Sequence, residues 1–173
     1  TQTPDFNYQA GFYINQIDVT IDCGDTEVEI YYTLDGSLPN ETSNYYGYLD
    51  QDGILVSDNP IISISSTTVV RAIAISNNPS YLNSFVETNT YFLNEVHGVA
   101  VISISGEQVD NLLNGTGWMR PIGSFEIFDK NGLLIDEAVG EFNEHGNDSW
   151  AYDQRGLDYI IRDQYGYNYA IND

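Results

Sequence analysis

Short stretches in which polar and apolar side chains alternate dominate the first half of the chain. They cover residues 27–33, 61–65, 68–76 and 84–92. Gly, Pro, Asn and Asp separate them, and none shows a sustained helical period. Alternation with a period of two is typical of strands with one buried face. Several such strands joined by polar turns predict a β-sandwich of the immunoglobulin or fibronectin type.

The pattern restarts just after residue 94, and a new apolar run covers residues 99–104. We therefore place a domain boundary here and expect domains over residues 1–94 and 98–173. Residues 106–115 are the one segment that favours a helix, with Ser105 as its cap and Asn114-Gly115 as its end.

The second domain also shows a hairpin signal. Asn131-Gly132 stands between apolar runs at 124–128 and 133–135, and this dipeptide favours the tight turns that join antiparallel strands. The tail predicts a further strand pair at 157–162 and 165–171. The predicted fold class is all-β: an Ig/fibronectin III-like β-sandwich followed by a second, smaller β-rich domain with one short helix.

One turn in the first domain is marked by its residues. The strand ending at Thr33 runs into Leu34-Asp35-Gly36-Ser37-Leu38-Pro39. Asp-Gly supplies the positive φ that a tight turn requires, and the proline blocks further pairing in a central strand.

This turn and its flanking strands carry a family resemblance. Residues 30–39 (IYYTLDGSLP), 61–64 (IISI) and 67–74 (TTVVRAIA) together resemble the chitobiase/β-hexosaminidase C-terminal-type domain, over roughly residues 8–92. That family is a fibronectin-like accessory module common in bacterial extracellular proteins. The resemblance implies a structural role for these residues and no catalytic one.

The second half resembles the region that follows such a module in bacterial proteins related to the spore-coat CotH kinase family. The matching motifs are Trp118-Met119-Arg120-Pro121, residues 124–129, Gln154-Arg155 and residues 162–166. The sequence departs from the family at Asn147, where the family has a second glycine, and at Asp158, near which the family has a basic residue. The family's catalytic residues lie downstream of these motifs, so the resemblance implies fold and context but no catalytic residue here.

The charge narrows the choice of partners. The chain has 5 Lys and Arg against 26 Asp and Glu, a net charge of -21. Nucleic acids and anionic membranes would be repelled, so we expect no nucleic-acid partner and no membrane insertion. No apolar run is long enough to span a bilayer, and Thr1-Gln2-Thr3-Pro4 does not resemble a signal peptide. We expect an extracellular or cell-surface protein whose signal peptide has been removed.

Few residues suggest a metal or a reaction. Asp50-Gln51-Asp52-Gly53 fits a calcium loop at Asp50 and Asp52 or, since a third ligand and a distant Glu are missing, a solvated turn. We otherwise expect no cofactor. Cys23 has no partner for an intrachain disulfide, and His97 and His145 lack the closely spaced ligands of a zinc site. Glu141 and Glu144 could be drawn as a glycosidase pair, but a chain with 26 acids offers such pairs by chance.

Aromatic residues are the more informative class, since the chain has 14 Tyr and 2 Trp. Tyr45, Tyr46 and Trp150 fall in predicted loops, where their rings could stack on a sugar or contact a protein. The alternative is that these tyrosines fill half-buried strand positions.

We therefore expect a non-catalytic extracellular module pair, part of a larger secreted bacterial protein, that acts in protein-protein contact, adhesion or assembly. Its partners would be other extracellular protein modules or a second copy of the chain. Two alternatives stay open: a carbohydrate-binding accessory module that uses loop aromatics to hold a polysaccharide, and the N-terminal part of a CotH-like secreted kinase. A CotH-like catalytic domain downstream is compatible with each of them.

Overall fold

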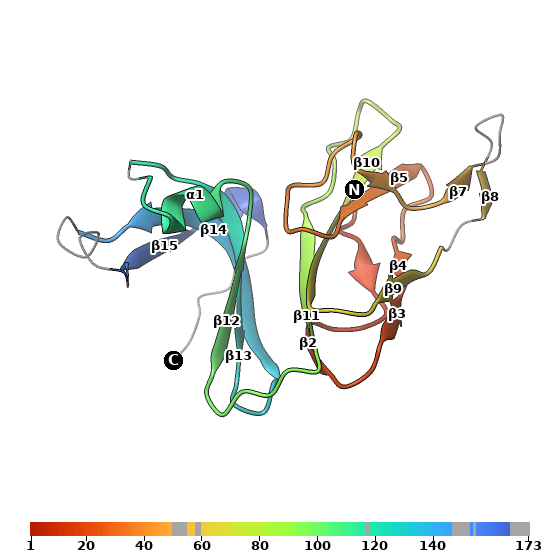
Figure 1. Ribbon diagram of the computed structural model, residues 1–173. Helices are drawn as coiled ribbons and strands as arrows, with labels where there is room; N and C mark the ends of the chain where they lie inside the picture. The colour runs from red at the N-terminus through yellow and green to blue at the C-terminus, as the bar shows by residue number, and fades with distance from the viewer. Residues whose placement is uncertain (50–54, 58–59, 117, 147–152, 154, 167–173) are drawn as a thin grey trace. The chain divides into compact units, whose positions relative to one another are not determined.

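The computed structural model describes residues 1–49, 55–57, 60–116, 118–146, 153 and 155–166. The chain forms two compact units, Thr1–His97 and Gly98–Asp173. Each is built mainly from β-strands (Figure 1). The predicted all-β fold class is confirmed, and the arrangement of sheets is sandwich-like.

The first unit contains a five-stranded sheet in the order β2-β11-β10-β5-β6. Its strands are β2 (Gly11–Tyr13), β5 (Val28–Thr33), β6 (Asn44–Tyr45), β10 (Thr68–Ser76) and β11 (Glu87–Leu93). The central strand β10 pairs antiparallel with β11 and β5, and β2 joins β11 in parallel. The alternating stretches thus formed strands, although β11 begins three residues later than expected, at Glu87.

Shorter strands form the other layer of the first unit. They are β1 (Asp5–Phe6), β3 (Ile17–Val19), β4 (Ile21–Asp22) and β9 (Ile62–Ile64). β1 pairs with β4 and β3 pairs with β9, both antiparallel. β7 (Tyr48–Leu49) and β8 (Leu55–Ser57) form a separate two-stranded ribbon.

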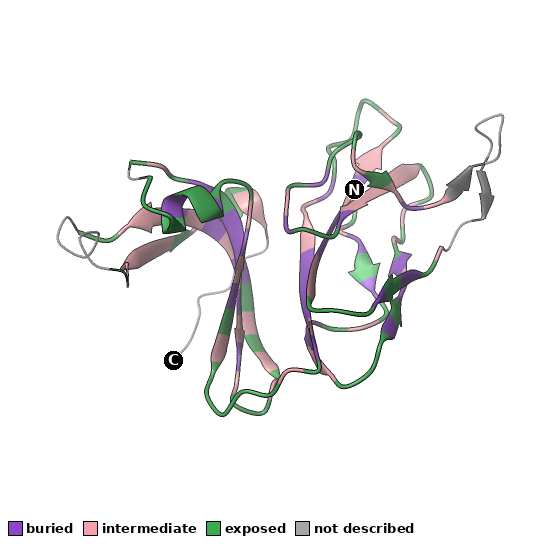
Figure 2. Ribbon diagram, viewed as in Figure 1, coloured by how far each residue is buried: buried purple, intermediate pink, exposed green. Residues whose placement is uncertain are grey.

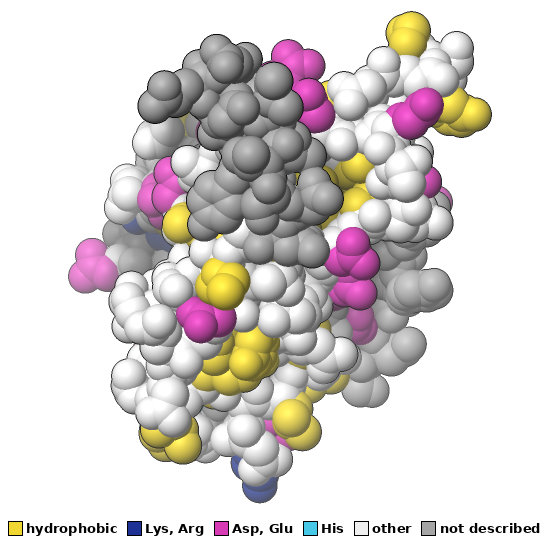
Figure 3. All heavy atoms as spheres, turned by 90° about the vertical axis from the view of Figure 1, so that its right-hand side faces the viewer, with side chains coloured by type: hydrophobic (Ala, Val, Ile, Leu, Met, Phe, Trp, Pro, Cys, Tyr) yellow, Lys and Arg dark blue, Asp and Glu magenta, His cyan; other side chains and the backbone are white. Residues whose placement is uncertain are grey.

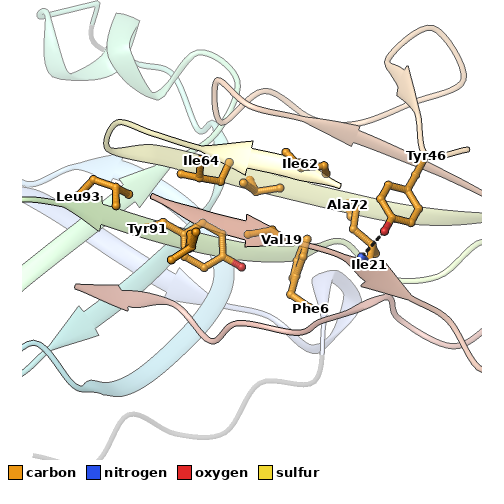
Figure 4. Packing of buried hydrophobic residues seen from close by; sticks show 11 residues of the cluster. Phe6, Val19, Ile21, Tyr46, Ile62, Ile64, Ala72, Tyr91 and Leu93 are labelled. Carbon is orange, nitrogen blue, oxygen red and sulfur yellow. Dashed lines mark hydrogen bonds between the residues drawn. The ribbon is translucent and has the colours of Figure 1, made fainter. Parts of the chain in front are cut away.

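The core of the first unit lies between these layers (Figure 4). β10 supplies Val70 and Ala72, both 0 % exposed, and β3 supplies Val19 from the opposite layer. Polar and apolar residues alternate along β10 because every second side chain points into the core, as the sequence predicted. The other buried members are Phe6, Ile17, Ile21, Tyr46, Ile62, Ile64, Tyr91 and Leu93.

A buried arginine stabilises the turn after β5. Gly36 adopts φ 77°, as the Asp-Gly pair predicted, and Asp35 Oδ1 accepts hydrogen bonds from Ser37 N at 3.0 Å and Ser37 Oγ at 2.6 Å. These bonds from Ser37 lower the pKa of Asp35. Arg71, only 2 % exposed, donates to Gly36 O and to Thr88 Oγ1, each at 3.2 Å. The motif is structural in this unit.

The second unit is a four-stranded antiparallel sheet in the order β12-β13-β14-β15. The strands are β12 (Val101–Ser105), β13 (Ile122–Phe128), β14 (Leu134–Glu144) and β15 (Leu157–Ile161). The predicted hairpin joins β13 to β14: Gly132 has φ 82°, and Asp129 Oδ1 accepts hydrogen bonds from the backbone of Asn131 and Leu133 at 2.8 and 2.9 Å.

The helix of this unit, α1 (Val109–Leu113), covers one face of the sheet. Figure 2 shows that its buried side faces the strands. α1 is shorter than predicted, and Ser105 does not cap it, because Ser105 ends β12 and Gln108 takes the N-cap position at φ 66°. In the tail, residues 163–165 form a 3₁₀ turn, which includes the predicted turn at Asp163-Gln164 and also Tyr165, the first residue of the second predicted strand. Gly166 is a bend, and residues 167–171 of that strand lie outside the described residues.

Close packing against glycine shapes the core of this unit. The Phe142 and Tyr159 rings lie 4.5 Å apart, and Val109 and Leu112 pack on Phe142. A Cβ at Gly123 would lie 2.3 Å from Ser105 O and 2.9 Å from Phe142 Cε2. Only glycine leaves room here for both the neighbouring strand and the ring.

Candidate functional site

A pocket of about 270 Å³ opens at one end of the second unit's sheet. It is lined by Trp118, Arg120, Asn143, Glu144 and Gly146. Phe142 N donates to Pro121 O at 2.9 Å, so the segment that leads into β13 runs beside the end of β14. The described lining residues therefore come from two adjacent segments, one before β13 and one at the end of β14.

Trp118 is the unusual residue of this pocket. Its side chain is 94 % exposed, although a large aromatic ring normally gains free energy when it is buried. Its backbone has φ 68°, a left-handed conformation that is uncommon for a residue other than glycine. The next residue, Met119, packs against the core of the unit. Met119 thus anchors the segment while the indole stays in solvent.

Among the described residues, the polar lining comprises a cation, an amide and a carboxylate. None of the hydrogen bonds or ion pairs among the described residues engages the guanidinium of Arg120 or the carboxylate of Glu144. The pocket therefore offers a set of donors and a set of acceptors beside an exposed ring. This combination suits a ligand with an apolar face and several hydroxyl groups.

Glu141, one residue before the buried Phe142, is already occupied. Its Oε2 lies 2.9 Å from Arg162 Nη2, and its Oε1 accepts a hydrogen bond from Tyr165 Oη at 3.2 Å. Arg162, with smaller effects of Tyr165 and Arg120, lowers the pKa of Glu141. A carboxylate held in its ionised form is unsuited to donate a proton, so Glu141 does not fit the general-acid role of a glycosidase pair.

The structure separates the two tyrosines that the sequence suggested. Tyr45 is half-buried on β6, with its ring against Tyr31 at a centroid distance of 5.6 Å. Tyr46 is only 5 % exposed, and its hydroxyl accepts a hydrogen bond from Ile21 N at 2.8 Å (Figure 4). The expectation of an exposed Tyr46 ring is wrong, because adjacent residues at a strand point to opposite faces.

The remaining predicted residues are an aromatic residue, two acidic residues and the two histidines. Trp150, Asp50 and Asp52 lie outside the described residues, so the stacking and calcium hypotheses that rest on them stay predictions. The histidines lie in separate units. His97 Nε2 is 3.1 Å from Glu95 Oε2, and His145 Nδ1 is 2.7 Å from Asp158 Oδ1.

Trp118 and Arg120 were part of a family motif in the sequence, but nothing there marked them as a site. The signal that could have found them is local composition. Trp118 follows Gly115-Thr116-Gly117 and precedes Pro121, a context that favours loops over strands. An aromatic residue in such a loop is a candidate for an exposed ring.

The comparisons with known proteins bear on the first unit. A family model, the chitobiase/beta-hexosaminidase C-terminal domain, matches residues 8–84. This type of domain is a non-catalytic accessory domain of glycosidases, and it occurs in extracellular proteins. No curated protein and no solved structure matches the chain. No helix within the described residues is long and apolar enough to cross a membrane.

Proposed function

We propose that the protein is a non-catalytic extracellular accessory module whose second unit binds carbohydrate at the pocket beside Trp118. The observation that carries the proposal is the 94 % exposure of the Trp118 indole at the rim of that pocket. A ligand that covers an exposed flat ring removes apolar surface from water, which favours binding.

The lining supports a sugar as the ligand. One face of a pyranose presents C–H groups, which pack well on an indole, while its hydroxyls point outward from the ring. Arg120 can donate to these hydroxyls, Glu144 can accept from them, and Asn143 can do both. The first unit adds context, because the domain type that it matches is associated with carbohydrate-acting proteins.

Replacement of Trp118 tests the proposal. Affinity electrophoresis through gels that contain chitin, glucan, xylan or mannan derivatives would measure retention of the wild type and of Trp118→Ala. We expect the variant to bind at least about tenfold more weakly, as is usual when a central aromatic anchor is removed. Because the indole is exposed, the variant should keep its circular dichroism spectrum.

Tyr81→Ala is the matched control. Tyr81 is also an exposed aromatic residue, at 64 %, but it belongs to the first unit and lies far along the chain from the pocket residues. Its loss should leave retention unchanged. Equal retention of the wild type and Trp118→Ala on every polysaccharide would refute the proposal.

Protein contact is a second candidate, favoured by one observation. At the hairpin end of the second unit's sheet, Val101 pairs with Phe128, and Phe128 pairs with Leu134. Several apolar side chains around this end are exposed: Val99 (68 %), Ile102 (51 %), Leu133 (67 %) and Ile135 (56 %). Clusters of this kind mark interaction surfaces more often than isolated exposed residues do.

Light scattering over a range of protein concentrations tests this candidate. Self-association through the hairpin end would raise the average mass with concentration, and Leu133→Glu would abolish the increase. A constant monomer mass, together with unchanged binding of other extracellular modules by Leu133→Glu, would reject this candidate while leaving the carbohydrate proposal intact.

A further inference from the structure

The charges of the pocket restrict which carbohydrate it can hold, an inference that rests on the proposed function. We propose that the ligand is a neutral glycan, bound mainly through one sugar ring, rather than an acidic or amino polysaccharide.

The first argument is the local balance of charge. Among the described residues, the charged side chains that line the pocket are Arg120 and Glu144, which carry opposite charges. Glu141, a half-buried carboxylate on β14, is compensated by Arg162 at 2.9 Å, and Asp158 shares a hydrogen bond with His145 at 2.7 Å. A charged sugar would therefore meet one favourable and one unfavourable neighbour. A hydroxyl group meets two favourable ones, because it both accepts and donates hydrogen bonds.

The second argument is the charge of the chain around the pocket. A net charge of -21 repels an anionic polysaccharide over distances longer than a hydrogen bond. Figure 3 shows the same imbalance on a face of the first unit, where Asp and Glu side chains are exposed and Lys and Arg are scarce. A single exposed Arg120 in the pocket does not offset this repulsion. A cationic polysaccharide would be attracted to acids over the whole surface, so its binding would not depend on Trp118.

The third argument is size. A volume of about 270 Å³ lies just below the range of about 300–1,000 Å³ that is usual for ligands of drug size. One indole beside three polar side chains can cover one sugar ring. The pocket thus fits a single ring of a glycan rather than a long stretch of polymer.

The experiment compares matched oligosaccharides of equal length by titration calorimetry, at low and at high salt. The probes are N-acetylglucosamine, glucose, xylose and mannose oligomers as neutral ligands, glucosamine oligomers as cationic ligands, and galacturonate oligomers as anionic ligands. We expect at least one neutral oligomer to bind, with an affinity that changes by no more than about twofold with salt and falls by about tenfold or more in Trp118→Ala. We expect binding of the glucosamine oligomers to vanish at high salt and to be insensitive to Trp118→Ala.

Two charge variants sharpen the comparison. Glu144→Gln keeps an acceptor at the same place but removes the negative charge, and Arg120→Gln keeps a donor but removes the positive one. For a neutral ligand, each variant should weaken binding by only about two- to fivefold. For an acidic ligand, Glu144→Gln would strengthen binding and Arg120→Gln would abolish it.

The outcomes separate the two proposals. Binding of galacturonate or glucosamine oligomers that depends on Trp118, persists at high salt and is as tight as that of any neutral oligomer would overturn the neutral assignment but keep the carbohydrate site. If no oligomer of any charge shows binding that depends on Trp118, the proposed function itself fails.

Discussion

The hydrophobic cores of the two units differ in size and in the element that covers the main sheet. Among the described residues, the core cluster of the first unit has 11 buried members, drawn from both layers of the sandwich (Figure 4). That of the second unit has three, Val109, Leu112 and Phe142, with partly buried side chains packed around them. A sheet covered by another sheet buries side chains along its length, whereas a helix of five residues covers only a small part of a sheet.

This difference indicates which substitutions would destabilise each unit and which unit has surface available for a ligand. The stability of the first unit depends on its large hydrophobic core. Its largest buried polar side chain, Arg71, donates a hydrogen bond that stabilises a turn. The second unit depends on close fits at Gly123 and around Phe142, and its sheet ends in an open pocket. This difference is in keeping with the proposal that the second unit binds the ligand.

Removal of a large core side chain is the strongest way to break the first unit alone. Tyr91 is 0 % exposed and also donates a hydrogen bond to Tyr8 O at 2.9 Å. Tyr91→Ala should lower the free energy of unfolding of this unit by about 3–5 kcal/mol. Circular dichroism during urea denaturation follows the strands of both units, so the loss of the first unit alone would appear as an earlier, partial transition. Both tryptophans, Trp118 and Trp150, belong to the second unit, so a change in tryptophan fluorescence comes from that unit, although the exposed Trp118 should contribute little to it.

We expect the fluorescence transition of Tyr91→Ala to stay where it is in the wild type. If fluorescence and circular dichroism instead shift together, the two units unfold cooperatively and their separate treatment is wrong.

Gly123→Ala should break the second unit in the same experiment. The new Cβ would lie 2.3 Å from a backbone oxygen of the neighbouring strand, so β12 and β13 would have to move apart. Overpacking of this kind costs about 1–3 kcal/mol, and the fluorescence transition should shift by that amount. Gly98→Ala is the control, because nothing lies within 4 Å of a Cβ at that position. A shift of equal size in both variants would show that the fit at Gly123 is unimportant.

Acid should weaken the second unit by a smaller amount through Glu141. Because Arg162 lowers the pKa of Glu141 in the folded state from 4.5, this ion pair stabilises the unit above about pH 4.5 and loses its effect as the pH falls through the lowered pKa. The urea concentration at the midpoint of the fluorescence transition should therefore be higher for the wild type than for Arg162→Gln at neutral pH. The difference between the two midpoints should become smaller as the pH falls.

Desolvation and Asp136 raise the pKa of Glu137, which acts in the opposite direction. This effect is common to both proteins and cancels in their difference. If the difference in urea midpoint between the wild type and Arg162→Gln does not change with pH, Arg162 stabilises the unit through packing and not through its charge.

The strands of both units were largely predictable, because alternation and turn residues are local properties. β10 follows the alternating stretch at 68–76, and Asn131-Gly132 forms the turn it predicted. The length of α1 was not predictable, because Ser105 serves equally well as a cap or as a strand residue and its pairing with Ser124 decides between them.

The site was harder to foresee because exposure is a tertiary property. Tyr45 and Tyr46 look alike in the sequence, yet only Tyr46 lies over Ile21 in the core. Trp118 is the reverse case, since apolar rings are usually buried and only the fold shows that this one is not.

The backbone of Trp118 has one further consequence. Glycine would adopt φ 68° without the clash that a Cβ introduces, which costs roughly 1–2 kcal/mol in a left-handed residue. Glycine at position 118 would therefore give the more stable fold. Trp118 therefore lowers the stability of the fold at this position. Such a loss is expected if the indole is required for binding a ligand.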